Sequence, residues 1–166
     1  MYPNGLQSIV SLFESLPDQE KREALISYAD QAPRWRPKDS ESFDLEDVRK
    51  DEECTDTVGV FLKVDGDDRV LFRVTLGPQV QTLTKAMTSI LCRGLHDATL
   101  QEVLDVPADF VPKIVGGELV RVRSQTVYYV LTRMKGICQV FFNRRRSKAV
   151  NNAVIADNAD IAGNGR

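Results

Sequence analysis

The sequence predicts an α+β fold in which helices cover a small antiparallel β-sheet. Two neighbouring segments, residues 58–64 and 70–76, alternate apolar and polar side chains, which is typical of strands with one buried face. The sequence DGDD between them favours a tight turn. Helical periodicity occupies the chain before and after this pair. Because the two strands are adjacent in sequence, we expect them to form an antiparallel hairpin on which the helices pack.

The composition is that of a globular protein. The chain has 166 residues, of which 42% are hydrophobic and 28% charged, and this length suffices for one core. No apolar run approaches the ~18 residues of a membrane-spanning helix, and a net charge of -2 creates no attraction for nucleic acid. We therefore expect neither a membrane nor nucleic acid as a partner.

The N-terminal sequence MYPNGLQSIVSLF lacks the features of a signal or transit peptide. We expect a cytoplasmic protein, or a plastid stromal protein whose transit peptide has been removed.

The N-terminal part of the chain is expected to form a helical hairpin. Apolar residues recur at helical spacing over residues 6–16 and, after Pro17, again over residues 24–29. Residues 32–51 are rich in Pro, Ser, Asp, Glu and Arg, which predicts an exposed connecting loop. Trp35 lies in this loop, where it either anchors a partner or closes the helical hairpin over the core.

Helical patterns return after the β-hairpin. An apolar stripe runs through residues 83–95. Thr99 and Glu102 have the spacing of a capping box at the start of a short helix, and residues 107–115 are expected to form another short helix. Ser124 is expected to cap the last long helix.

The C-terminal end of that last helix is expected near the basic sequence NRRR at residues 143–146. The residues beyond it are rich in Ala, Asn, Asp and Gly and have no sustained amphipathic stripe. We therefore expect one domain over residues 1–146 and a flexible C-terminal tail over residues 147–166. The arginines suit either contact with RNA or the dipole of a helix C terminus, and we favour the second interpretation.

Three widely spaced cysteines, Cys54, Cys92 and Cys138, do not form an even disulfide framework and indicate free thiols in a reducing compartment. Cys138 lies on the apolar stripe of the last helix, so we expect it in the core. Cys92 lies away from the main stripe of its helix, and we expect it to be half exposed and inert. Cys54 lies in the polar sequence KDEECTDTVGVF, just before the first strand of the hairpin. Its side chain is therefore placed to reach a partner.

The charges around Cys54 decide which chemistry its thiol suits. The neighbouring carboxylates are expected to raise its pKa above the usual ~8.5, and they belong to Asp51, Glu52, Glu53 and Asp56. A cysteine hydrolase needs a thiolate with a base beside it, and His96, the one histidine of the sequence, would have to fold back to supply that base. No C-x-x-C or H-x-x-H spacing supports a metal site. A shuttle thiol has a weaker requirement, because a partner enzyme can supply both the base and the electrophilic sulfur.

Four pieces of the sequence carry a family resemblance. They are the helix end YADQAPRW, the cysteine that enters a β-hairpin, the segment KAMTSILCRGLHDATLQEVLDVPADFV at residues 85–111, and RSQTVYYVLTRMK at residues 123–135. In their order and spacing they resemble the SufE proteins, the sulfur-acceptor partners of class II cysteine desulfurases in iron-sulfur cluster assembly. The resemblance extends over about residues 6–146 and implies a SufE/IscU-like fold.

The resemblance also implies a role in sulfur transfer. Cys54 matches the persulfide-forming cysteine of the family, and Arg123 matches the arginine that opens the final helix. The implied partner is a SufS-like class II cysteine desulfurase, which uses pyridoxal phosphate and is stimulated when it passes persulfide sulfur to Cys54. An Fe-S scaffold complex is the implied recipient. The protein itself is expected to be an accessory protein without enzymatic activity, cofactor or metal.

Two further expectations follow from the family for the surroundings of Cys54. Arg123 is expected to order the Cys54 loop, for example through Asp56, although a solvated side chain at a helix start remains the alternative. The family tucks the resting thiol against an apolar cavity, where burial protects the persulfide from oxidation. The side chains expected to line such a cavity are Val58, Val60, Leu83 and Met87.

The sequence around Cys54 departs from the family pattern. Glu53 replaces the usual glycine before the cysteine, and Asp56 and Thr57 stand where serine and glutamine are expected. A second interpretation therefore stays open beside the sulfur carrier. It is a binding-only adaptor that docks on a desulfurase or another partner without transferring sulfur.

Overall fold

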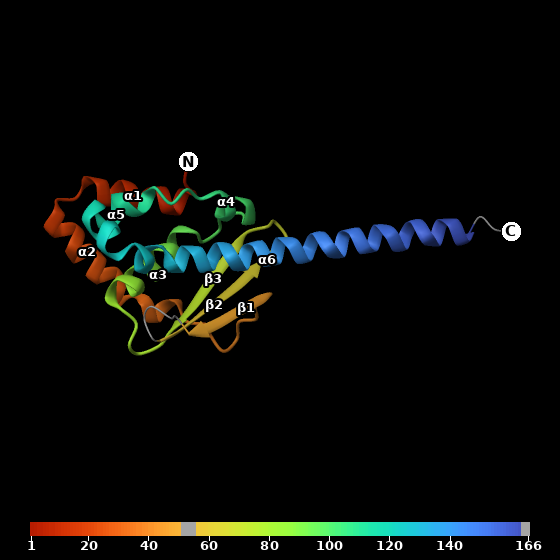
Figure 1. Cartoon of the computed structure of the whole chain (residues 1–166), viewed down its shortest axis with the longest axis horizontal. Coiled ribbons are helices and arrows are strands. Elements are labelled where there is room, and N and C mark those ends of the chain that lie inside the picture. The colour runs from red at the N-terminus through yellow and green to blue at the C-terminus, as the bar shows by residue number, and fades with distance from the viewer. Residues whose placement is uncertain (51–55, 164–166) are drawn as a thin grey trace.

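The computed structural model describes residues 1–50 and 56–163 (Figure 1). In these residues the chain forms a three-stranded antiparallel sheet in the order β1-β2-β3, together with helices that pack on it. The predicted α+β fold is therefore confirmed.

The N-terminal helical hairpin consists of α1 (Asn4–Ser15) and α2 (Asp18–Asp30). Pro17 precedes the first turn of α2, where its missing N–H costs no helical hydrogen bond. The apolar stripe of α1 is buried in the core, as its helical spacing predicts. A 3-10 turn, η1 (Ala32–Trp35), follows α2.

The sheet contains the predicted hairpin, β2 (Thr57–Val64) and β3 (Val70–Leu76), and one strand that the sequence did not reveal. This strand is β1 (Leu45–Lys50), which pairs with β2 from Leu45 opposite Leu62 to Lys50 opposite Thr57. The prediction of a plain loop over residues 32–51 is therefore wrong. The sequence LEDVRK has no clear apolar alternation because β1 is an edge strand with no fully buried side chain.

The segment before β1 folds over the outer face of the sheet. Phe43 packs on Phe61 of β2 with ring centroids 5.3 Å apart. Glu41 accepts hydrogen bonds from Nε of Arg73 on β3 at 3.0 and 3.2 Å, and the Arg73 guanidinium lies 5.9 Å from the Trp35 ring centroid. Trp35 itself packs against the core. These contacts favour the structural interpretation of Trp35 that the sequence left open.

The inner face of the sheet carries the core. Val58, Val60 and Leu62 of β2 are fully buried, and α6 (Gly117–Gly163) packs on β2 while α3 (Thr82–Gly94) packs on β3. Two short helices, α4 (Leu100–Asp105) and α5 (Phe110–Val115), pack on α6 from the other side. The predicted capping box of α4 is confirmed, because both of its reciprocal hydrogen bonds are present.

The last helix differs from its prediction at its C-terminal end. At its start, a short helical segment from Gly117 meets the long helix at a kink at Arg123, whose φ of -128° and ψ of 33° are not helical, so the long helical run begins at Ser124, close to its predicted start. At the other end the helix continues to Gly163 and projects from the body of the molecule (Figure 1). The prediction that regular structure ends near Arg146 is wrong. Residues 147–163 are rich in alanine, a strong helix former, and this propensity is independent of amphipathicity.

Among the helices that the structure describes, none combines the length and apolar composition needed to cross a lipid bilayer.

Candidate functional site

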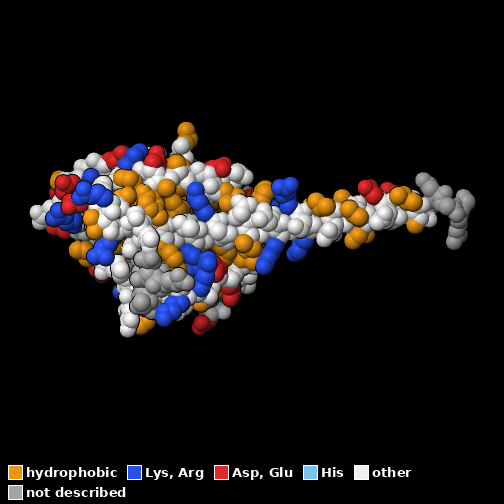
Figure 2. Space-filling model, viewed as in Figure 1, with side chains coloured by type: hydrophobic (Ala, Val, Ile, Leu, Met, Phe, Trp, Pro, Cys, Tyr) orange, Lys and Arg blue, Asp and Glu red, His pale blue; other side chains and the backbone are white. Residues whose placement is uncertain are grey.

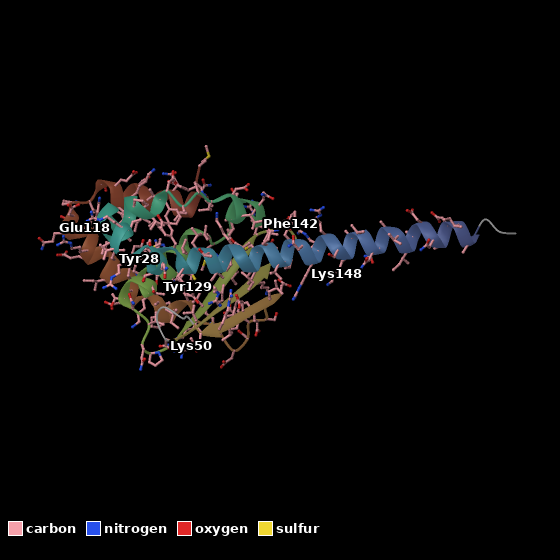
Figure 3. The ribbon with its side chains drawn as sticks, in the orientation of Figure 1. Tyr28, Lys50, Glu118, Tyr129, Phe142 and Lys148 are labelled. Atoms are coloured by element: carbon pink, nitrogen blue, oxygen red, sulfur yellow. The ribbon has the colours of Figure 1, made fainter. Side chains whose placement is uncertain are left out.

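Cys54 lies outside the described residues, and the structure defines the two strand ends on either side of its segment. Lys50, the last residue of β1, is the register partner of Thr57, the first residue of β2. Figure 3 shows Lys50 at this end of the sheet. β1 therefore ends, and β2 begins, at neighbouring positions of the sheet.

Asp56 anchors the start of β2 to the turn that follows β3. Its Oδ1 accepts a hydrogen bond from the backbone N–H of Thr57 at 2.7 Å, and its Oδ2 accepts one from the backbone N–H of Gln79. The backbone N–H of Gly77 in turn donates to the carbonyl of Thr57 at 2.9 Å. A carboxylate that bridges two amides fixes the backbone on both sides of it. Asp56 thus holds one end of the Cys54 segment in place.

Gly77 makes this anchor sterically possible. A Cβ atom at this position would lie 1.8 Å from Oδ1 of Asp56, far inside van der Waals contact. The carboxylate occupies the space that any larger residue would need. Gly77 is therefore required by close approach to Asp56, a role that the sequence motif GP does not disclose.

Arg133 provides a second anchor, and sequence reasoning missed it. Its side chain is 4% exposed and lies between α6 and the sheet. Nε donates to Oδ2 of Asp47 at 3.1 Å, and Nη2 donates to the carbonyls of Asp47 at 2.6 Å and Val58 at 3.0 Å. Nη1 donates to the hydroxyl of Tyr129 at 2.7 Å, one helical turn earlier on α6 (Figure 3).

This network joins α6 to both strands that flank the Cys54 segment. A buried guanidinium is tolerated when its donors find acceptors, and these four bonds use four of its five N–H donors. The only signal in the sequence is the spacing of Tyr129 and Arg133, four residues apart on one helix. That spacing is too common to identify a buried cation.

Arg123, the second predicted site residue, lies at the kink of α6 with an exposed side chain. Among the described residues no ion pair joins it to a carboxylate, and the Asp56 carboxylate binds backbone amides instead. The expected contact between Arg123 and Asp56 is therefore not among the described hydrogen bonds. The role of Arg123 in ordering the Cys54 loop stays a prediction.

Arg123 does line an apolar groove between α2, α3 and the start of α6. The groove has a volume of about 350 Å³ and lies beside Leu83. Of the four side chains expected to line a cavity, Leu83 is the one that borders this groove. Val58, Val60 and Met87 are completely buried in the core.

A second pocket, of about 300 Å³, opens next to the Asp56 anchor. Gly77 and Pro78 form one wall, and the lining contains two cationic residues, Arg36 and Lys85, and one acidic residue, Asp30. This part of the surface therefore offers cations near a segment that is otherwise acidic. Opposite charges of this kind lower the cost of an anion at the site.

The two described cysteines are both buried in the core. Cys138 is inaccessible, as predicted, and burial raises the pKa of its thiol to about 12. Cys92 is also buried, so the prediction that it is half exposed is wrong, and burial raises its pKa well above the ordinary thiol range. The wrong prediction arose because α3 is covered on several sides, by α1, α2 and the sheet, and not along one stripe only. Neither thiol can serve as a nucleophile near neutral pH.

Within the described residues, no group of three or more His, Cys, Asp and Glu side chains is arranged to hold a metal ion. His96 lies at the end of α3 with a half-exposed imidazole, whose Nε2 is 3.6 Å from Oδ2 of Asp97.

Comparison with known proteins identifies the family to which the sequence is similar. The model of SufE, the Fe-S metabolism associated domain, matches residues 7–138. Among solved structures, the solution structure of a hypothetical protein from Thermus thermophilus superposes with a TM-score of 0.68 at 23% identity, covering 86% of this chain and 99% of that one. The crystal structure of a nitrogen-fixing NifU-like protein (N-terminal) from Brucella abortus matches with a TM-score of 0.47 at 17% identity, covering 68% of this chain and 88% of that one. No curated protein sequence matches significantly.

Proposed function

Since the chain belongs to the SufE family of Fe-S metabolism associated domains, we propose that it is a sulfur carrier that accepts persulfide sulfur on Cys54. In this proposal a SufS-like class II cysteine desulfurase is the donor and is stimulated by the transfer. The sulfur then passes to an Fe-S scaffold complex in the cytoplasm. The chain acts as an accessory protein, and the pyridoxal phosphate chemistry belongs to the desulfurase.

One observation carries the choice of Cys54. The family match includes this residue, and the two other thiols of the chain are buried with raised pKa values. A transferable sulfur needs a thiol that a second protein can reach. Cys92 and Cys138 fail this requirement, which supports Cys54 as the acceptor.

The proposed transfer is a thiol exchange that needs no external oxidant or reductant. The thiolate of Cys54 attacks the outer sulfur of the desulfurase persulfide, so that a new S–S bond forms at Cys54. The bond between the two sulfurs of the donor breaks, and the desulfurase cysteine leaves as a thiolate. The outer sulfur carries its proton or charge with it, and its oxidation level is unchanged.

The anchors described above support this chemistry by limiting where the thiol can act. Cys54 precedes Asp56 by two residues, and two trans peptide units span at most ~7 Å. The bonds of Asp56 to Thr57 and Gln79 hold one end of the segment on the sheet, and Arg133 holds the strands beneath it. A docking enzyme thus meets the segment at a defined edge of a rigid body.

Local electrostatics support a donor that brings its own activating groups. The acidic residues beside Cys54 disfavour its thiolate, so the free protein is expected to be a sluggish nucleophile. Arg36 and Lys85, which line the pocket beside Asp56, and Arg123, which lines the apolar groove, are cations with which an acidic patch of the desulfurase can pair. Activation of Cys54 on docking restricts sulfur transfer to the correct partner.

The decisive test is mass spectrometry of the protein after incubation with a class II desulfurase and cysteine. We expect a gain of about 32 Da, the mass of one sulfur atom, confined to the peptide that contains Cys54. Peptides with Cys92 and Cys138 are the internal controls and are expected to remain unmodified.

The variant Cys54→Ser separates the carrier from a binding-only adaptor. For a carrier, the substitution abolishes both the mass gain and the stimulation of the desulfurase while the complex still forms. If stimulation survives the substitution in full, the protein acts as an adaptor and the proposal fails.

A further inference from the structure

The C-terminal part of α6 leaves the body of the molecule as a single helix. All side chains described between residues 143 and 162 are exposed, and Figure 1 shows that no other element accompanies this part of the helix. At 1.5 Å per residue the projection is about 30 Å long. Most helix stability in proteins comes from packing of one face, and no described element packs on this part of the helix, so a partner that covers one face would stabilise it.

One face of the projecting helix carries an aliphatic stripe. Val150, Val154 and Ile161 are four and seven residues apart, which places them within about 40° of each other around the helix axis. Their exposed fractions are 58%, 53% and 75%. Figure 2 shows such hydrophobic side chains along the projection. Ile155, also exposed, lies on another side of the helix.

Charges of opposite sign follow one flank of this stripe. Arg146 lies near the base of the projection, and Asp157 and Asp160 lie near its tip, on the same side of the stripe at helical spacing. Figure 2 shows the same polarity, with basic side chains at the base and acidic ones toward the tip. Arg146 and Asp157 are about 16 Å apart along the axis, beyond the ~8 Å screening length at physiological salt. They therefore interact little within one copy.

Arg145 belongs to a different interaction. Both of its terminal nitrogens donate to the carboxylate of Asp68 in the turn between β2 and β3. Of the ion pairs formed by the described residues, this is the one that involves the basic cluster at residues 144–148. Arg146 and Lys148 thus present their charges to solvent, and Figure 3 shows Lys148 pointing away from the helix.

We propose that the projecting helix pairs antiparallel with the same helix of a second copy of this chain. A two-fold axis near Asn152 makes the contact self-complementary, because each pairing of residue i with j recurs as j with i. Val150 of each copy then meets Val154 of the other. The equivalent flanks face each other, which brings Arg146 of one copy beside Asp157 and Asp160 of the other.

The length of the projection fits this arrangement. In the same register Ile161 at the tip of one copy lies beside Asn143 of the other, at the base of the projection. The two helices overlap along their whole free length, and the two bodies lie at opposite ends. A parallel pairing would instead bring like charges together at both ends, which is unfavourable. The aliphatic stripe is short, so the dimer is expected to be weak and to dissociate on dilution.

The first test measures self-association of the full-length protein by sedimentation velocity over a range of concentrations, with reductant present to exclude disulfide dimers. We expect a monomer–dimer equilibrium. Val154→Ser should weaken it about tenfold or more, because the two-fold axis places this side chain in the contact twice. Ile155→Ser is the matched control, since it removes a similarly exposed aliphatic side chain from another side of the helix and should leave the equilibrium unchanged.

The second test uses charge. Arg146→Glu should weaken dimerisation, whereas Lys148→Glu, the same charge change on the side of the helix away from the stripe, should have little effect. The double variant Asp157→Lys/Asp160→Lys should also dimerise poorly. Its helix should stay intact, because cations near a helix C terminus are favourable. Mixing this variant with Arg146→Glu should produce a heterodimer tighter than either homodimer.

Each contrary outcome overturns the proposal. A protein that is monomeric at every concentration has no such contact. A dimer that tolerates both Val154→Ser and Arg146→Glu uses another surface. Binding of the projection to phospholipid vesicles without self-association would assign the stripe to a membrane instead. None of these readouts depends on Cys54, so the proposed dimer is tested independently of the proposed sulfur transfer.

Discussion

Beyond the kink at Arg123, the two halves of α6 share one helical backbone conformation and have opposite surroundings. Residues 127–138 contribute an apolar stripe and the buried Arg133 to the body of the molecule, while residues 143–162 are exposed on all sides. The first half is held by tertiary contacts and anchors the strands around the Cys54 segment. The second half depends on its own helix propensity. The difference shows that the same helix serves as a scaffold at one end and as a free surface at the other.

The largest loss in the free energy of unfolding is expected for Arg133→Met. This change leaves the carboxylate of Asp47 and the carbonyl of Val58 without their buried donor, which should lower the free energy of unfolding by about 3 kcal/mol or more. Urea denaturation measures this change. Arg144→Met, an exposed substitution of the same kind on the same helix, is the control and should change stability by less than ~0.5 kcal/mol. Equal effects of the two variants would remove the proposed distinction between the halves of α6.

Gly77→Ala tests the anchor at the sheet edge. The new methyl group overlaps the Asp56 carboxylate, so we expect a loss of about 1–3 kcal/mol in the free energy of unfolding. The loss should be much smaller in an Asp56→Ala background, where the obstruction is gone, and a double-mutant cycle measures this coupling. Gly136→Ala in the packed half of α6 is the control. No atom lies within 4 Å of its added Cβ, and it should stabilise the helix by up to ~1 kcal/mol. If the losses in the free energy of unfolding caused by Gly77→Ala and Asp56→Ala are additive, the proposed contact between the two residues is contradicted.

Glu41→Gln tests the outer face of the sheet through pH. The hydrogen bond from Arg73 lowers the pKa of Glu41 below its ordinary value of 4.5, so ionised Glu41 stabilises the fold above that pH. This contribution is lost as the pH falls through the lowered pKa. We expect Glu41→Gln to cost about 1 kcal/mol at pH 7 and the difference from the parent to shrink at pH values below 4.5. Denaturation at several pH values measures it, and a difference independent of pH would contradict the role of the charge.

The smallest change in the free energy of unfolding is expected when the chain is cut after Arg146. Residues 147–162 are all exposed, so urea unfolding of the shortened protein should match that of the full chain within ~0.5 kcal/mol. Its self-association should nevertheless disappear. A large loss of stability at dilutions where the full chain is monomeric would show that the projection folds back on the body.

The sequence predicted those parts of the fold that local signals specify. The prediction of the β-hairpin was correct because both strands alternate around a turn with strong local preferences. The prediction of the capping box of α4 was correct because its signature is also local. β1 was missed because an edge strand needs no apolar face, and only pairing with β2 makes it a strand. Cys92 was misplaced because its burial depends on elements distant in sequence.

For the candidate site, the sequence by itself determined the family, the chemistry of an isolated thiol at Cys54 and the acidity around it, because these follow from residue identity and order. Only the tertiary structure decided how the site is supported. The guanidinium of Arg133 reaches Val58, 75 residues away, and Gly77 makes room for Asp56 from the end of another strand. Such contacts form when chain segments distant in sequence meet in space. Neither composition nor periodicity reports the distance between two such segments, which is why these anchors emerged only from the folded chain.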